Sequence, residues 1–337
     1  MRKFLGQLIK LQDYISRYEV DIYRYPSQYI RLKKQQWKQI NTAWENGTLD
    51  SLSTISKNTT DIYEKFQLLN EEKKSVLDPF KQFFQKVRKN EEVQDEISFQ
   101  PSVSIDGIED ELDSNEMFSS LNNDPKTLDE VKLIFLESLF RFQMKWASST
   151  IREKSYIDDR FYEEENLKYF LQRFPDTYLV LYKPVFLLKH APIEADIIII
   201  SPTTTWCITI LEGEEGSVFL GSKERFWTER IGSKEKKVLS PLIGLNRMEK
   251  IVRKVFQLNE IEMPIKKIVL NRTGYFDYPF PPYDVDFIEK RNYEGWFTNL
   301  RNLSSPLKHV QLKAAQSLLL YCQTTCVKRV EWNENEE

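Results

Sequence analysis

Residues 193–219 read IEADIIIISPTTTWCITILEGEEGSVF, and this stretch decides the fold. Four isoleucines, Ile197–Ile200, are followed after a Ser-Pro turn by a second β-rich run, Trp206–Leu211. Short apolar runs of β-branched and aromatic residues, bounded by turn residues, predict buried strands. We therefore expect two core strands. Asp196 directly precedes the first, and an acidic, glycine-containing turn follows the second.

The flanking sequence changes between helical and strand patterns in a fixed order. Helix, strands, helix and strand in succession predict an α/β (α+β) fold with a central mixed sheet flanked by helices. Ser240 followed by Pro241 is a typical helix start, with serine as the N-cap. The predicted helices cover residues 158–174 and those from Ser240 on, and the predicted strands cover residues 178–181, 185–188, 218–220, 225–228 and 267–270.

The N-terminal part has apolar residues at spacings of three and four, which predicts an all-helical N-terminal region. The first helix fits a packed helical hairpin. Because lysine and arginine accompany its apolar stripe, it also fits a helix lying on a membrane surface. The predicted helices here cover residues 3–24, residues from Ser27 to Asn46, and residues 59–89.

The segment Glu91–Asp124 contains eleven acidic residues and no lysine or arginine. This composition is typical of a solvated linker, and it also suits an acidic segment that mimics DNA or covers a basic groove. A strongly apolar helix over residues 128–148 follows it. The predicted domains are residues 1–90, helical; 91–126, an acidic linker with the composition of a disordered segment; 127–283, an α/β domain; and 284–330, C-terminal helices packed on it.

The composition of the whole chain argues against several classes of function. The 337 residues are 41% hydrophobic and carry a formal net charge of −3, so a nucleic-acid site would have to be a local basic patch. With three cysteines and two histidines, a zinc site is a poor fit. No window approaches the roughly 20 apolar residues that span a bilayer, and the N-terminus lacks a signal-peptide pattern. We expect a cytoplasmic protein without a membrane span.

An ordered set of short motifs runs from about residue 158 to residue 270. Together they resemble the nuclease-related domain, NERD, a bacterial family related to the restriction-endonuclease-like fold with its PD-(D/E)xK catalytic signature. The resemblance implies a restriction-endonuclease-like central sheet in a bacterial protein. The matching residues are Glu165, Glu194-Ala195-Asp196, Pro202, Gly216, Trp227, Ser240-Pro241 and Ile268–Leu270.

This chain differs from the family pattern at the catalytic residues. In such nucleases two carboxylates hold a divalent metal and a lysine helps to position or activate the attacking water. Counting from Asp196, the Glu-x-Lys pair falls on Thr209 and Leu211, or on Ile210 and Glu212 if the turn holds one extra residue. Neither pair supplies that chemistry, so the resemblance implies a degenerate active site.

Two alternatives remain for the acidic residues. Glu165 and Asp196 could form half of a metal site, or they could be polar caps at the ends of elements. An active enzyme would need Mg or Mn at a migrated site built from Glu165, Asp196 and either Glu212 or Glu214. The last two side chains also suit an exposed turn between strands. Without that activity, no cofactor is expected.

A basic cluster follows the hairpin. Arg247, Lys250 and Lys254 are spaced to form one stripe on a helix, which suits phosphate contacts or simply a solvated face. The leading hypothesis is a non-catalytic binding or scaffolding protein with weak nucleic-acid binding. The alternatives are the active nuclease and a protein-interaction module that binds a protein partner through the N-terminal helices. The remaining candidate nucleic-acid-binding residues are Lys234, Lys236, Lys237 and Arg253.

Overall fold

The computed structural model describes residues 5–49, 125, 127–188, 191–303 and 305–329. The predicted helix over residues 59–89 and nearly all of the predicted linker over residues 91–126 lie outside these ranges. The chain divides into two compact units, residues 1–34 with 139–337 and residues 35–138. The predicted domain boundaries stay predictions.

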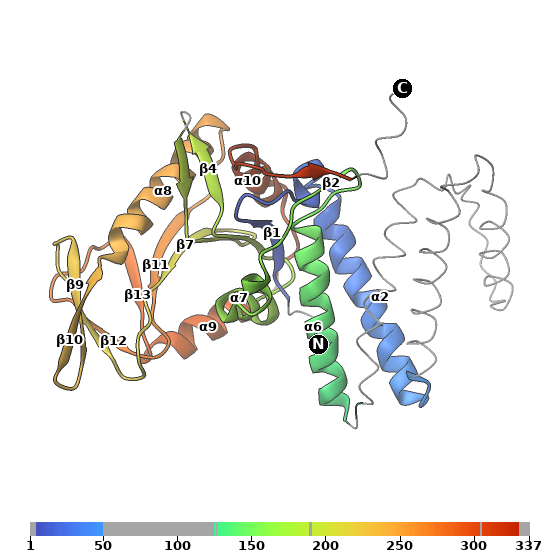
Figure 1. Ribbon diagram of the computed structural model, residues 1–337, viewed down its shortest axis with the longest axis horizontal. Helices are drawn as coiled ribbons and strands as arrows, with labels where there is room; N and C mark the ends of the chain where they lie inside the picture. The colour runs from blue at the N-terminus through green and yellow to red at the C-terminus, as the bar shows by residue number, and fades with distance from the viewer. Residues whose placement is uncertain (1–4, 50–124, 126, 189–190, 304, 330–337) are drawn as a thin grey trace, which may run out of the picture. The chain divides into compact units, whose positions relative to one another are not determined.

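A six-stranded mixed sheet forms the centre of the larger unit, in the order β1-β3-β6-β7-β11-β13 (Figure 1). β6 is antiparallel to both of its neighbours, whereas β1 is parallel to β3, and β7, β11 and β13 run parallel to one another. The predicted α/β fold with a central mixed sheet is thereby confirmed. The strands are Gln7–Leu11 (β1), Leu179–Tyr182 (β3), Ile197–Ile200 (β6), Thr205–Ile210 (β7), Ile265–Leu270 (β11) and Val285–Ile288 (β13).

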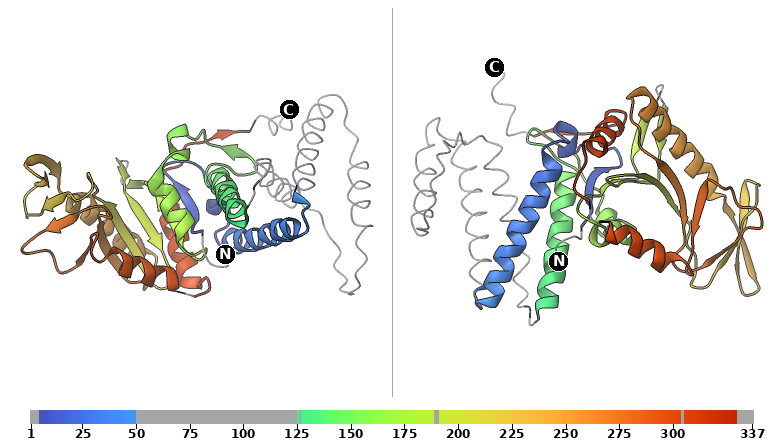
Figure 2. Two further views of the ribbon diagram at one scale, coloured as in Figure 1. Left: turned by 90° about the horizontal axis from the view of Figure 1, so that it is seen from below. Right: turned by 180° about the vertical axis from the view of Figure 1, so that it is seen from behind.

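Helices cover both faces of this sheet (Figures 1 and 2). Because the sheet is covered on both sides, all four residues of β6 are buried, as its continuous apolar sequence predicts. On the α7 and α9 side, Phe170, Phe174 and Phe297 pack in one core cluster with Ile197 and Ile199. The helices are α7 (Glu165–Arg173) and α9 (Tyr293–Asn302) on one face, and α8 (Pro241–Leu258) and α10 (His309–Leu320) on the other.

The N-terminal strand differs from the sequence-based prediction. The predicted helix over residues 3–24 is wrong, because Gln7–Leu11 form β1 and only Arg17–Val20 form a short helix, α1. Every residue of β1 is buried. The Gln7 side chain is satisfied there, since its Nε2 donates to the carbonyl oxygens of Pro26 (3.2 Å) and Asp176 (2.6 Å).

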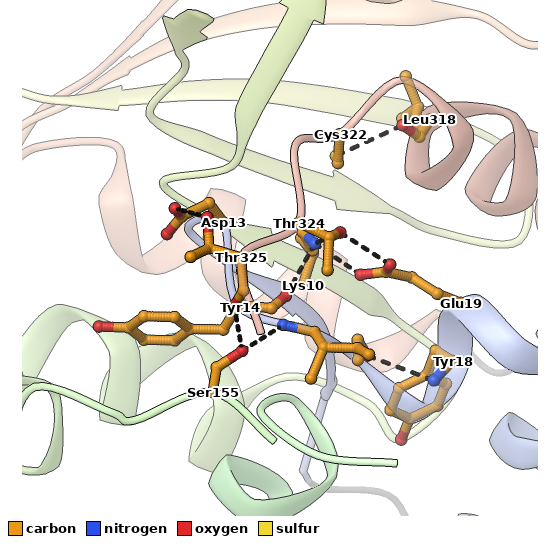
Figure 3. Close-up of polar contacts among 12 residues, drawn as sticks. Lys10, Asp13, Tyr14, Tyr18, Glu19, Ser155, Leu318, Cys322, Thr324 and Thr325 are labelled. Atoms are coloured by element: carbon orange, nitrogen blue, oxygen red, sulfur yellow. Dashed lines mark hydrogen bonds and ion pairs between the residues drawn. The ribbon is translucent and has the colours of Figure 1, made fainter. Parts of the chain in front are cut away.

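A buried lysine joins this strand to the C-terminal segment (Figure 3). Lys10 Nζ donates to the Tyr14 carbonyl (2.8 Å), to Glu19 Oε1 (2.6 Å) and to Thr324 Oγ1 (2.9 Å). Thr324 Oγ1 in turn donates to Glu19 Oε2 at 2.9 Å. All three protons of the ammonium group therefore have acceptors, which a buried charge requires.

The predicted helices after β1 are confirmed where the structure describes them. They are α2 (Tyr25–Glu45) and α6 (Leu128–Trp146). α2 begins two residues before the predicted cap and has Pro26 in its first turn, where proline is tolerated. Its end is marked by Gly47 at φ +67°, the left-handed conformation usual after a helix.

A second, smaller sheet has four strands, in the order β10-β9-β8-β12. The predicted strands over residues 218–220 and 225–228 are confirmed as the antiparallel pair β8 and β9, whereas β10, β12 and β13 were not predicted. The buried ring of Trp227 packs on Tyr278 and Phe287, with ring centroids 5.3 and 6.2 Å away. The strands are Val218–Leu220 (β8), Phe226–Ile231 (β9), Lys234–Leu239 (β10) and Tyr275–Asp277 (β12).

The remaining elements are short. The predicted helix over residues 158–174 is split into a 3-10 turn and α7, and the C-terminal helices expected within residues 284–330 are α9 and α10. None of the helices in the described part of the chain is long and apolar enough to cross a membrane. The short elements are β2 (Glu153–Lys154), η2 (Asp159–Tyr162), β4 (Val185–Leu188), β5 (Ala191–Glu194) and β14 (Val327–Lys328).

Candidate functional site

The carboxylate of Asp196 lies at the entrance to β6 and faces β7. Ile197 pairs with Ile208, so the preceding Asp196 stands opposite Thr209. Thr209 Oγ1 donates a 2.6 Å hydrogen bond to Asp196 Oδ2. A side chain at Gly244, in the first turn of α8, would begin 3.7 Å from the same oxygen. The carboxylate thus meets a hydroxyl from β7 and bare backbone from α8.

The two glutamates at the start of α7 take different positions. Glu165, the residue matched from the sequence, is exposed. Its neighbour Glu164 is partly buried and lies 3.6 Å from Lys183 Nζ. Burial, foremost, and then the negative charges of Glu164 and Asp196 raise the pKa of Tyr182 well above its ordinary value. Tyr182 pairs with Ile197 in the sheet, so it lies on the strand next to Asp196.

Glu212 is held by an arginine that the sequence analysis did not single out. Arg272 Nε and Nη2 donate to the two carboxylate oxygens of Glu212 at 2.6 and 2.7 Å, and the Arg272 backbone N–H donates at 2.8 Å. The side-chain hydrogen bonds to Glu212 are the main reason why the pKa of Arg272 is above its ordinary value. Arg272 also donates to Asn166 Oδ1 at 2.6 Å and lies 4.5 Å from the centre of the Tyr169 ring. Glu212 is thus a partner in a two-pronged ion pair.

The acidic side chains do not fit a divalent cation held by several carboxylates. Glu214 is exposed, and Glu212 has both oxygens bound to Arg272. Among the residues that the structure describes, no group of three or more His, Cys, Asp or Glu side chains is placed to hold a metal ion. Thr209 is bonded to one oxygen of Asp196, so a metal bound to the other oxygen would still have to find its remaining ligands elsewhere.

The candidate basic residues fall into three groups. Lys234, Lys236 and Lys237 lie on β10, an exposed edge strand. Arg253 is paired with Glu249, with Nε 2.6 Å from Oε1. The third group is the α8 ridge, which consists of Arg247, Lys250 and Lys254; these residues are exposed and make no ion pair with any residue that the structure describes.

Six elements between residues 160 and 270 form one continuous part of the fold. α7, β3, β6, β7, α8 and β11 follow one another in the chain, and their four strands are neighbours in the sheet. Residues 160–270 match the family model of the nuclease-related domain. The nuclease-related domain therefore contains Asp196, Thr209, Glu212 and the α8 ridge, whereas Arg272 lies two residues beyond the matched range.

One curated relative matches a short segment. An RNA 2′,3′-cyclic phosphodiesterase from Geobacillus stearothermophilus is 58% identical over 41 residues, which are 12% of this chain and 13% of that protein. So short a match shows similarity of that segment alone. No solved structure matches the chain.

Sequence reasoning on the nuclease-related domain missed Glu164, Asn166, Tyr182 and Arg272. A signal for Arg272 is present, because the polar triplet Asn271-Arg272-Thr273 directly follows the apolar end of β11. Polar residues at the end of a buried strand mark a place where side chains from neighbouring elements meet. For the other three, the sequence offers no comparable signal.

Proposed function

We propose that the nuclease-related domain binds nucleic acid through the phosphate backbone and does not cleave it. The α8 ridge is the observation that carries this proposal, because its three cations face solvent on one side of a helix. Residues 223–258, which include the ridge, contain ten lysines and arginines and four glutamates, a net charge of +6 in a chain of net charge −3. Such a local excess of cations binds phosphates by releasing their counterions.

The contacts of the acidic side chains support binding without cleavage. Thr209 stands where the resemblance expects a second metal-binding carboxylate, and its hydroxyl is bonded to Asp196. Glu212, the other acidic candidate near β7, is neutralised by Arg272. Metal-dependent hydrolysis needs a cation that is held firmly beside the scissile phosphate, and these side chains are committed to other partners.

Plasmid cleavage in Mg²⁺ or Mn²⁺ tests the absence of catalysis. We expect no metal-dependent nicking by the wild-type protein above the level of Asp196→Ala. Nicking by the wild type that is lost in Asp196→Ala would instead establish the active nuclease with a migrated metal site.

Reversing the charge of the α8 ridge is expected to weaken DNA binding and flatten its salt dependence. The test is a triple variant, Arg247→Glu, Lys250→Glu and Lys254→Glu. On duplex DNA we expect its slope of log K against log salt to be shallower than that of wild type by about 2 to 3. Each phosphate contact contributes about 0.9 to the steepness of that slope. Fluorescence anisotropy between about 50 and 200 mM salt measures this slope.

The chain offers a matched control on α2. Arg31, Lys34 and Lys38 are exposed and have the same residue types at the same spacing as the α8 ridge. The corresponding triple glutamate variant has the same net charge change, and we expect it to keep most of the wild-type slope. Equal losses in the two triple variants would attribute binding to overall charge and contradict a site on α8.

A further inference from the structure

Three apolar side chains stand exposed where the β9–β10 hairpin meets α8. Phe226 is 50% exposed, Leu239 is 52% exposed and Ile243 is 44% exposed. Phe226 and Leu239 are directly opposite each other in the β9–β10 register, so they share one face of the hairpin. The Ser240 N–H donates to the Arg225 carbonyl at 2.9 Å and fixes the start of β9 beside the start of α8.

This apolar group continues into the α8 ridge. Ile243 precedes Arg247 by four residues, and Lys250 and Lys254 follow at spacings of three and four, so all four lie along one face of the helix. At the other end, the Arg225 guanidinium lies 5.7 Å from the centre of the Phe226 ring. The exposed Phe226 ring therefore has a cation beside it, on the strand whose start is hydrogen-bonded to the start of α8.

We infer that this surface binds single-stranded nucleic acid, with a base stacked on Phe226 and the following phosphates along the α8 ridge. The inference rests on the proposed function and names the form of nucleic acid that this site takes. Aromatic rings beside a cationic track are how single strands are bound without sequence preference. In a duplex both faces of each base are already stacked, so a duplex reaches the cations and leaves the ring uncovered.

Comparing Phe226→Ala on single strands and duplexes tests the inference. By anisotropy with mixed-sequence oligonucleotides, the variant should lose about five- to 150-fold in single-strand affinity, the range for one stacked base. Its duplex affinity should stay within about twofold of wild type, because the phosphate contacts are intact. Phe226→Tyr keeps the stacking face and should keep single-strand binding.

Tyr156→Ala is the matched control. Tyr156 is 73% exposed and has Lys154 Nζ 5.3 Å from its ring centre, so it repeats the pairing of an aromatic ring with a cation. It lies two residues after β2, and β2 and β10 are at opposite ends of the larger unit in Figure 1. We expect this variant to bind single strands as the wild type does.

The outcomes separate the two proposals. Absence of binding to both forms of nucleic acid would refute the proposed function and the inference with it. Equal wild-type affinity for both forms, unchanged by Phe226→Ala, would refute the inference and leave the proposed function standing. Binding to anionic phosphatidylserine vesicles that is lost in Phe226→Ala, with no oligonucleotide binding, would assign the surface to a membrane and overturn both.

Discussion

Replacing Glu19 with alanine is expected to lower the free energy of unfolding by about 3 to 5 kcal/mol. Lys10 is fully buried, and its ammonium group is neutralised by the Glu19 carboxylate at 2.6 Å. Removal of one partner leaves a buried charge uncompensated, which costs more than the intact pair contributes. Glu19 Oε2 also accepts the Thr324 hydroxyl, so the C-terminal segment loses a contact at the same time.

Urea denaturation of three variants separates this effect from ordinary loss of contacts. Lys10→Met removes the charge and keeps the apolar stem, so we expect it to be less destabilising than Glu19→Ala. Glu235→Ala breaks the 3.0 Å Arg230–Glu235 pair, whose side chains are about half exposed, and should change stability by under about 1 kcal/mol. If Glu19→Ala lowered the free energy of unfolding no more than Glu235→Ala does, the buried ion pair would contribute no more to stability than the exposed one.

Replacing Gly274 with alanine is expected to cost about 1 to 3 kcal/mol. A Cβ at this position would lie 2.3 Å from the Ser217 carbonyl oxygen. That oxygen accepts the Tyr275 N–H at 2.9 Å next to the parallel pairing of β8 with β12. The obstacle is backbone within a hydrogen bond rather than a flexible side chain, so relief requires the smaller sheet to shift.

Gly295→Ala is expected to change stability in the opposite direction to Gly274→Ala. Gly295 is in α9, and a Cβ there would meet nothing within 4 Å. Alanine is favoured over glycine in a helix by up to about 1 kcal/mol, so this variant should be more stable than wild type. Thermal or urea unfolding of both variants gives the comparison, and equal stabilities would contradict the close approach at Gly274.

The fold is predictable from sequence where local pattern and burial agree. β6 and β7 are apolar runs between turn residues, and they form the strands that those runs predict. β1 escapes prediction because Gln7 and Lys10 interrupt its apolar residues, which leaves a helical spacing. Both are accommodated by partners far away in the chain. β10 has the sequence KEKKVL, and its strand conformation depends on pairing with β9 rather than on burial.

The candidate site is predictable only in part. Counting from Asp196 at the family's spacing leads to Thr209, and in the structure Thr209 stands opposite Asp196 and is hydrogen-bonded to it. The Glu212–Arg272 pair joins residues 60 apart, and no local pattern connects them. The choice between Glu164 and Glu165 depends on a one-residue difference in where α7 begins, which is within the ordinary uncertainty of a helix end.

The position of β1 has a consequence for the order in which the protein folds. β1 is made before two of its partners, because Asp176, whose carbonyl accepts from Gln7, comes 169 residues after it and Thr324, which accepts from Lys10, comes 314 residues after it. Such distant pairings form slowly because a long loop must close first. Until β1 docks, β3 has an unpaired edge that can recruit strands from other chains. The chain is therefore expected to be most prone to aggregate in the interval between the synthesis of β3 and the docking of β1.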